Sequence, residues 1–84
     1  MHKTDLDIAR AAEIAASITV CASEEKVIAA LRAYAHPDVI SAARRVFRED
    51  LDAYYRAEGA VVGAAREERE AALLDTCHIR KDLA

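Results

Sequence analysis

The residues with the most reactive side chains lie close together near the end of the sequence. Cys77 and His78 are adjacent, with Asp75 three residues before His78 and Asp82 four residues after it. On a helix these spacings place side chains on one face, so the carboxylates could orient the imidazole for general base catalysis. An exposed histidine near a helix end is the simpler interpretation. We therefore predict no catalytic residues.

Metal binding is the other chemistry that cysteine and histidine could provide. A zinc site would have to gather Cys21, His36, Cys77 and His78 from separate helices, because the sequence contains neither C-x2-C nor H-x3-H. Both cysteines follow large apolar residues at helical spacing, which favours packed, reduced thiols. Glycine-rich phosphate loops and Ser–His–Asp spacings are also missing. We predict no metal and no cofactor.

The composition predicts a helical protein. Twenty of the 84 residues are alanine, and there are only two glycines and one proline. Alanine has the highest helix propensity, whereas glycine and proline interrupt helices. Apolar residues recur at steps of three and four, with no alternation of period two. The predicted fold class is all-α, in a single domain over residues 1–84.

Four helices are predicted from the apolar stripes and from the residues at their ends. Thr4, with Asp7 three residues later, forms a capping box for the first helix, and Ser23 is a second N-cap. The pair His36–Pro37 ends the second helix, and Pro37 begins the third. The predicted helices span residues 5–22, 24–35, 37–58 and 63–80.

The segment from Gly59 to Gly63 allows two structures. Gly59 could end the third helix, with Gly63 as a cap of the fourth. Alternatively the helix is continuous, since the apolar stripe keeps its phase through Val62 and Ala65. A continuous helix would be too long for so small a monomer to cover and would imply a dimer. We predict the break, and hence a small bundle of about four helices with a long third helix.

Two apolar stripes define the predicted core. The first helix contributes Ile8, Ala11, Ala15 and Ile18, with Ile14 and Cys21 alongside. The third helix contributes Ile40, Ala43, Phe47, Leu51 and Tyr54. Phe47 is the largest of these side chains, so we expect it to dominate the core. Because alanine buries little area, homo-oligomerisation is a further route to stability.

The charges exclude some classes of function. The net charge is −3, which gives no reason to expect non-specific binding to nucleic acid. The first residues lack the apolar region of a secretory signal, and no apolar run is long enough to span a membrane. The sequence thus predicts a soluble, cytoplasmic protein that does not bind membranes. Nine arginines against three lysines, together with the alanine content, is typical of bacterial or phage proteins.

By elimination, the sequence favours binding to another protein, as an adaptor, a regulator or an inhibitor. Arginine and tyrosine are residue types that anchor protein interfaces. The predicted partner-binding patch on the third helix consists of Arg44, Arg48, Leu51, Asp52 and Tyr55. Small helical proteins are common among phage and mobile-element inhibitors of host defence enzymes, including anti-CRISPR proteins. That association concerns the class, and no residue here shows it.

Two alternatives remain open. Helices 24–35 and 37–58 have the outline of a helix-turn-helix regulator, with Arg44, Arg45 and Arg48 as the basic cluster. Against this, the residues that would read bases are acidic or apolar, and the arginines come two turns too late. A small dimeric enzyme is the third hypothesis, because a chain of this length would need a dimer interface to form a pocket.

Overall fold

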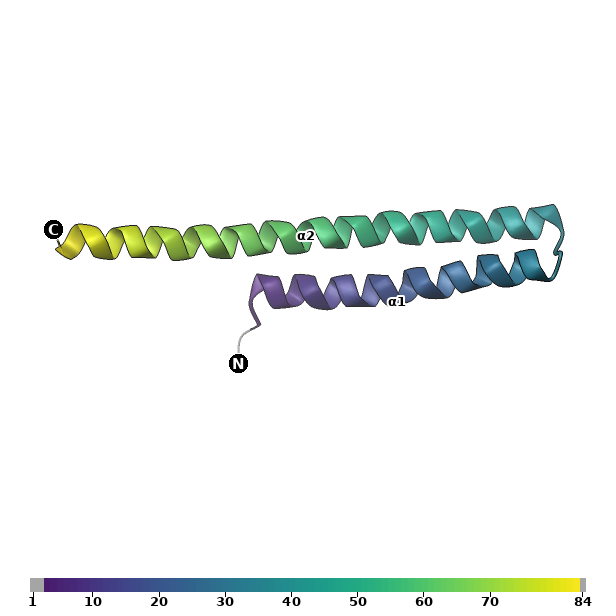
Figure 1. Cartoon of the computed structure of the whole chain (residues 1–84), viewed down its shortest axis with the longest axis horizontal. Coiled ribbons are helices and arrows are strands. Elements are labelled where there is room, and N and C mark those ends of the chain that lie inside the picture. The colour runs from purple at the N-terminus through teal and green to yellow at the C-terminus, as the bar shows by residue number, and fades with distance from the viewer. Residues whose placement is uncertain (1–2, 84) are drawn as a thin grey trace.

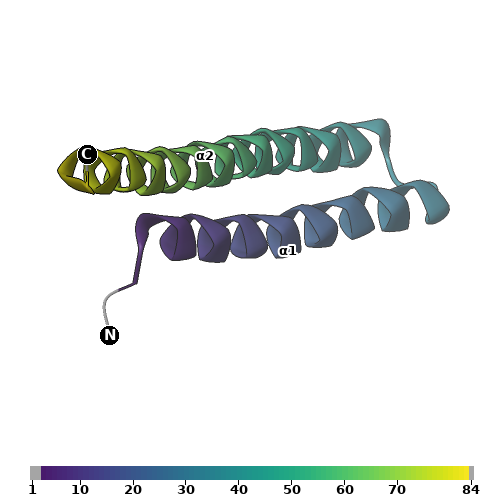
Figure 2. The ribbon, with the colours of Figure 1, turned by 60° about the vertical axis from the view of Figure 1, so that its left-hand side comes forward.

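The computed structural model describes the backbone of residues 3–83 and the side chains of residues 3–76. It forms a hairpin of two helices, α1 (Asp5–Arg32) and α2 (Pro37–Leu83). The helices run antiparallel, side by side (Figure 1 and Figure 2). At 1.5 Å per residue, α2 alone is about 70 Å long, which accounts for the longest dimension of 73 Å. The chain is all-helical, as predicted, but the bundle of about four helices is wrong.

Two predicted helix boundaries do not exist. Ser23 lies inside α1, where its hydroxyl is 3.0 Å from the carbonyl oxygen of Thr19, and it caps no helix. Gly59 and Gly63 lie inside α2, so the continuous helix is the observed alternative. A Cβ built on either glycine would meet nothing within 4 Å. The glycines weaken the helix without breaking it, because the residues around them keep contacting α1.

The start of α1 agrees with the sequence. The backbone N–H of Asp7 donates to the Thr4 hydroxyl at 3.2 Å. The backbone N–H of Thr4 donates back to the Asp7 carboxylate at 3.4 Å. This capping box satisfies two of the backbone donors that a helix start leaves unpaired.

The turn between the helices is a Schellman motif with a tyrosine at its left-handed position. The N–H of Ala35 donates to the carbonyl of Ala30 at 3.0 Å, and that of Tyr34 donates to Leu31 at 3.2 Å. These bonds satisfy carbonyl groups at the end of α1. Tyr34 has a φ of 50°, in a region that glycine usually occupies, and its side chain is 94% exposed. The Tyr34 ring therefore packs against neither helix.

The start of α2 uses the predicted proline. Pro37 is its first residue, where the missing N–H leaves no carbonyl without a partner. The imidazole Nδ1 of His36 accepts a hydrogen bond from the N–H of Asp38 at 3.1 Å. The His36 side chain therefore acts as the cap of α2.

The contact between the helices has the heptad spacing of a coiled coil. Half-buried or buried side chains recur at alternating steps of three and four residues on each helix. We call these two rows the seam. In α1 the seam positions are Leu6, Ala9, Glu13, Ala16, Val20, Ser23, Val27 and Ala30. In α2 they are Ile40, Ala43, Phe47, Asp50, Tyr54, Ala57, Val61 and Ala64. Alanine occupies many of these positions, so the seam buries little apolar surface.

Contacts at three places fix the register of the hairpin. Ser23 contacts the Asp50 carboxylate at the middle. Val27 lies beside Phe47 toward the turn. Near the start of α1, Leu6 lines a hollow together with Ala64 and Glu68 of α2. The part of α2 after Glu68 therefore has no α1 residue beside it, as Figure 1 shows.

The predicted core is not enclosed in the hairpin. Within residues 3–76 no hydrophobic side chain is fully buried, and Ser23 is the only buried residue, at 5% exposure. On α1 the predicted core stripe faces solvent, with Ile14 at 61% and Ile18 at 67% exposure. Cys21 is exposed as well, which overturns its prediction as a packed thiol. Phe47 is only half-buried. Over the part of the chain described, no helix has the length and apolarity to cross a membrane.

Candidate functional site

A groove beside the seam brings together three of the five residues predicted to bind a partner. Arg44, Arg48 and Leu51 line it from α2. Phe47 of α2 and Val27 of α1 complete the lining, and the groove encloses about 330 Å³. Three of its side chains are apolar and two are cationic. We call this feature the Arg44–Leu51 groove.

The seam spacing explains why these side chains converge. Val27 and Phe47 occupy seam positions, so they form the floor between the two helices. Arg44, Arg48 and Leu51 follow one another at steps of four and three, which places them along one edge of α2 beside that floor. Both arginines are exposed, whereas Leu51 is half-buried. The result is an apolar floor with a basic rim.

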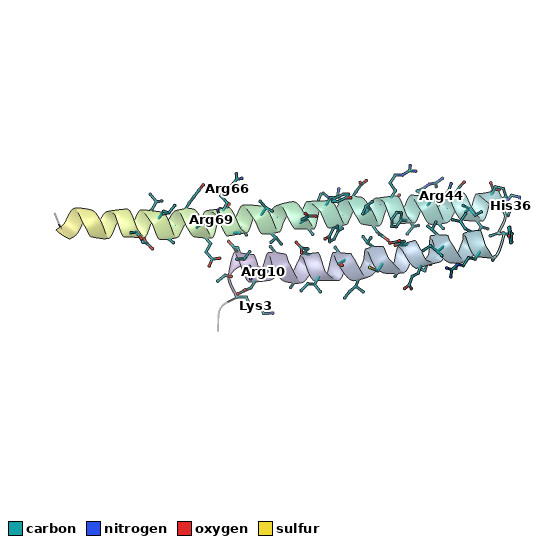
Figure 3. All side chains as sticks on the ribbon, viewed as in Figure 1. Lys3, Arg10, His36, Arg44, Arg66 and Arg69 are labelled. Carbon is teal, nitrogen blue, oxygen red and sulfur yellow. The ribbon has the colours of Figure 1, made fainter. Side chains whose placement is uncertain are left out.

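A second, polar hollow adjoins this groove. It is lined by Ser41, Arg44, Arg45 and Arg48. Arg44 and Arg48 thus belong to both features, and Arg45 adds a third guanidinium from the outer face of α2. Figure 3 shows Arg44 close to the turn, a few residues after His36. Three arginines therefore lie within two helical turns, although the net charge of the chain is negative.

Neither Arg44 nor Arg48 is neutralised within the hairpin. Across residues 3–76 the only basic and acidic side-chain atoms within 4.0 Å of each other are His36 Nδ1 and an Asp38 carboxylate oxygen, at 3.6 Å, and no arginine is within that distance of a carboxylate. Arg48 therefore makes no ion pair with Asp52, one turn later on the same helix. Arg44 and Arg48 are instead like charges at i and i+4, a spacing that destabilises a helix.

The other two predicted residues lie outside the groove. Tyr55 is 59% exposed and continues the α2 edge one turn beyond Leu51. Its ring contacts that of Tyr54, with centroids 5.9 Å apart and planes tilted by 54°. Asp52 is exposed and does not line the groove. Tyr55 can therefore extend a surface that begins at the groove, whereas Asp52 belongs to the outer face of α2.

The reactive residues considered first do not form a described site. The side chains of Cys77, His78 and Asp82 lie outside the described residues, and Asp75 is exposed on α2. Among the side chains that the structure does describe, no group of three histidines, cysteines or carboxylates could hold a metal ion. His36 lies at the turn, remote in sequence from both cysteines.

Comparison with known proteins adds no constraint on this site. No family model, curated protein or solved structure matches this chain. Its function is therefore argued from the groove and from the exposed faces of the two helices.

Sequence reasoning missed the groove floor and the polar contact at the centre of the seam. Phe47 was assigned to a closed core, and Val27 to a separate short helix. The signal that identifies both is the 3–4 alternation continued through Ser23 and Asp50. Those two positions are polar, and a search for apolar stripes therefore passes over them.

Proposed function

We propose that this chain is a helical-hairpin interaction module that binds another protein through the Arg44–Leu51 groove. The partner segment is an amphipathic helix that carries an apolar side chain flanked by carboxylates. The observation that carries the proposal is the groove's composition, an apolar floor bordered by two exposed arginines. The proposed setting is the cytoplasm, and the chain acts by binding and not by catalysis.

The apolar floor supports this choice of partner. Val27, Phe47 and Leu51 remain partly exposed in the hairpin, so a side chain seated among them removes further apolar surface from water. An amphipathic helix laid in a groove between two helices is a recurring mode of recognition, with anchors at steps of three and four. Tyr55 lies one turn farther along the same edge, where it can contact the next turn of such a helix.

The charges at the rim of the groove specify the sign of the charge that the partner carries. Arginine pairs with carboxylates through two parallel hydrogen bonds, and it is a frequent hot-spot residue in interfaces. Arg44 and Arg48 repel each other in the free chain, and a carboxylate placed between them removes that repulsion. An acidic partner is therefore favoured over a basic one.

DNA binding stays the alternative because of the arginine-lined hollow. The helix-turn-helix on which it was based needs two short helices that cross, with the second in the major groove. Residues 24–32 instead continue α1, which lies alongside α2 (Figure 2). What remains is a cluster of three arginines that could contact phosphates without reading bases. We keep this hypothesis as an outcome of the test.

Affinity capture with charge reversal tests the proposal. The tagged full-length chain, an Arg48→Glu variant and an Arg66→Glu control are used to capture proteins from nuclease-treated host extract. Arg66 is also an exposed arginine of α2, but it lies four turns beyond the groove (Figure 3). We expect Arg48→Glu to weaken partner binding by about 2 kcal/mol, or roughly thirtyfold, and Arg66→Glu to change it little.

Two further measurements separate protein binding from DNA binding. Tyr55→Ala should weaken binding to the captured protein but leave the arginine cluster intact. Duplex binding through Arg44, Arg45 and Arg48 would instead fall with salt, with a slope of about −2.7 in log K against log salt. Tight, salt-sensitive binding of a random duplex, unchanged by Tyr55→Ala, would refute the proposed function. So would a partner that binds wild type and Arg48→Glu equally.

A further inference from the structure

Helix α1 carries two separate heptad stripes, and α2 covers only one of them. The seam stripe faces α2. A second stripe, which we call the outer stripe, follows steps of four and three along the opposite side of the helix. It consists of Asp7, Ala11, Ile14, Ile18, Cys21, Glu25, Ile28 and Arg32. All of these residues are exposed in the hairpin.

A helix that is apolar on opposite sides belongs inside a larger bundle. In α1 the stretch from Ala11 to Ala22 has charged side chains only at Glu13, on the seam side. A helix at the surface of a protein would instead place charges on the side opposite its seam. Helix α2 does so, since its outer face carries Arg45, Glu49 and Arg56. Over the length that the two helices share, the outer side of α1 is therefore the apolar face that no helix covers.

The exposed area supports the same conclusion. The chain exposes 6982 Å². A compact folded monomer of its mass, 9.2 kDa, would expose about 4,900 Å², so the excess is about 2,000 Å². This excess is shared between the outer stripe and the part of α2 that extends beyond α1. A stable interface removes about 800 Å² from each partner, and obligate homodimers remove more. Because no hydrophobic side chain within residues 3–76 is fully buried in the hairpin, such a contact would also supply the apolar burial that the single chain lacks.

We infer that the outer stripe of α1 pairs with the outer stripe of a second copy of this chain. The two α1 helices run antiparallel about a twofold axis between Ile18 and Cys21, with an α2 helix flanking each of them. In this alignment Ile18 lies opposite Cys21 of the second copy, and Ala11 lies opposite Ile28. The stripe shares no residue with the Arg44–Leu51 groove, so the dimer presents two grooves.

The charges of the stripe select this alignment. Asp7 lies at one end and Arg32 at the other, so an antiparallel pair places Asp7 opposite Arg32 of the second copy at both ends. A parallel pair would place like charges opposite each other at Asp7, Glu25 and Arg32. An antiparallel shift of one heptad toward the start of α1 would bring Asp7 opposite Glu25. Only the alignment about Ile18 and Cys21 pairs both charged ends favourably.

Sedimentation equilibrium of the full-length chain tests the dimer. We expect the mass of two chains at roughly 100 µM and a melting temperature that rises with protein concentration, because folding and association are coupled. A single-chain mass at that concentration, with a melting temperature independent of concentration, would overturn the inference.

Two glutamate substitutions locate the interface. Ile18→Glu should raise the dissociation constant of the dimer at least a hundredfold. Leu73→Glu is the matched control, because Leu73 is 61% exposed on α2 and lies outside the stripe. A dimer that survives Ile18→Glu, or that Leu73→Glu dissociates, would contradict the inference. If Ile18→Glu unfolds the chain, crosslinking of the folded protein that keeps Ile18 decides whether the outer stripe is the interface.

Crosslinking through Cys21 tests the alignment in a chain with Cys77→Ser. About the proposed axis the two Cys21 positions are offset by about 4.5 Å along helices about 8–10 Å apart. A short bis-maleimide should therefore join them at high yield. A second variant moves the thiol to position 32 by combining Cys21→Ser with Arg32→Cys. In the antiparallel pair the two copies of position 32 are separated by on the order of 25 residues of helix, or at least 35 Å. The crosslink should therefore be abolished. A crosslink at position 32 as efficient as the one at position 21 would indicate parallel pairing, because a parallel pair places each residue opposite itself, and it would overturn the alignment.

Discussion

Ser23 of α1 and Asp50 of α2 meet at the centre of the seam, where the serine hydroxyl contacts a carboxylate oxygen of the aspartate. Ser23 is the most buried residue that the structure describes. The seam residues next to this pair are apolar, including Val20, Val27 and Phe47. A shift of the helices would leave either polar group facing apolar side chains. The pair therefore specifies the register of the hairpin, as a polar position does in a coiled coil.

Removing one partner of this pair should cost more than removing both. Ser23→Ala leaves the Asp50 carboxylate without its partner, and we expect the free energy of unfolding to fall by about 1 kcal/mol. Adding Asp50→Leu should restore stability to at least the wild-type value, because the seam is then apolar at both positions. Urea unfolding followed by circular dichroism measures both. A double variant less stable than Ser23→Ala would show that Asp50 contributes to stability independently of Ser23.

The two glycines of α2 should be replaceable with a gain in stability. Gly59 and Gly63 are exposed, and an added Cβ meets no other atom within 4 Å. Gly59→Ala and Gly63→Ala are each expected to raise the free energy of unfolding by about 0.5–1 kcal/mol, since alanine favours the helix. Ala60→Gly is the control and should lower stability by a similar amount. If either glycine-to-alanine change lowered the free energy of unfolding, another chain would have to pack closely against this face of α2.

The strained turn should also respond to glycine. Tyr34→Gly removes the Cβ that opposes a φ of 50°, and we expect it to raise the free energy of unfolding by about 1 kcal/mol. Tyr34→Ala keeps the Cβ and loses only an exposed ring, so it should leave stability nearly unchanged. Thermal melts at one protein concentration compare the three chains. If both variants raised the free energy of unfolding equally, the destabilisation would come from the tyrosine ring and not from the backbone conformation.

The parts of the fold that sequence predicts correctly are those with local causes. The capping box of Thr4 and Asp7 and the start of α2 at Pro37 depend on residues within one helical turn. Ser23 misleads because a serine followed by two glutamates is typical of a helix start. Its seam position is decided by Asp50, which lies 27 residues away in the sequence.

Longer-range features could not be assigned from spacing alone. Helix α1 has two stripes at helical spacing, and the more hydrophobic one, with Ile14 and Ile18, faces away from α2. The spacing identifies both stripes but does not say which one the same chain covers. Similarly, Gly59 and Gly63 each lower helix stability by about 1 kcal/mol relative to alanine. A prediction from the local sequence therefore ends the helix there. The seam continues through Ala57, Val61 and Ala64, and its contacts maintain the helix.

Charge reversal at Arg44 should affect stability and binding in opposite directions. Arg44 and Arg48 are like charges one turn apart, so Arg44→Glu replaces a repulsion by an attraction in the favourable orientation. We expect the free energy of unfolding to rise by about 0.5 kcal/mol at low salt, and this gain should shrink as salt screens the pair. The matched control is Arg56→Glu, which places a like charge four residues after Asp52 and should lower stability by a similar amount. Urea unfolding at two salt concentrations measures both changes, and binding to the captured partner is measured in parallel.

Arg44→Glu should weaken that binding roughly thirtyfold, because the groove loses one of its two guanidinium groups. A variant that gains stability and keeps full affinity would show that the Arg44 charge has no part in recognition.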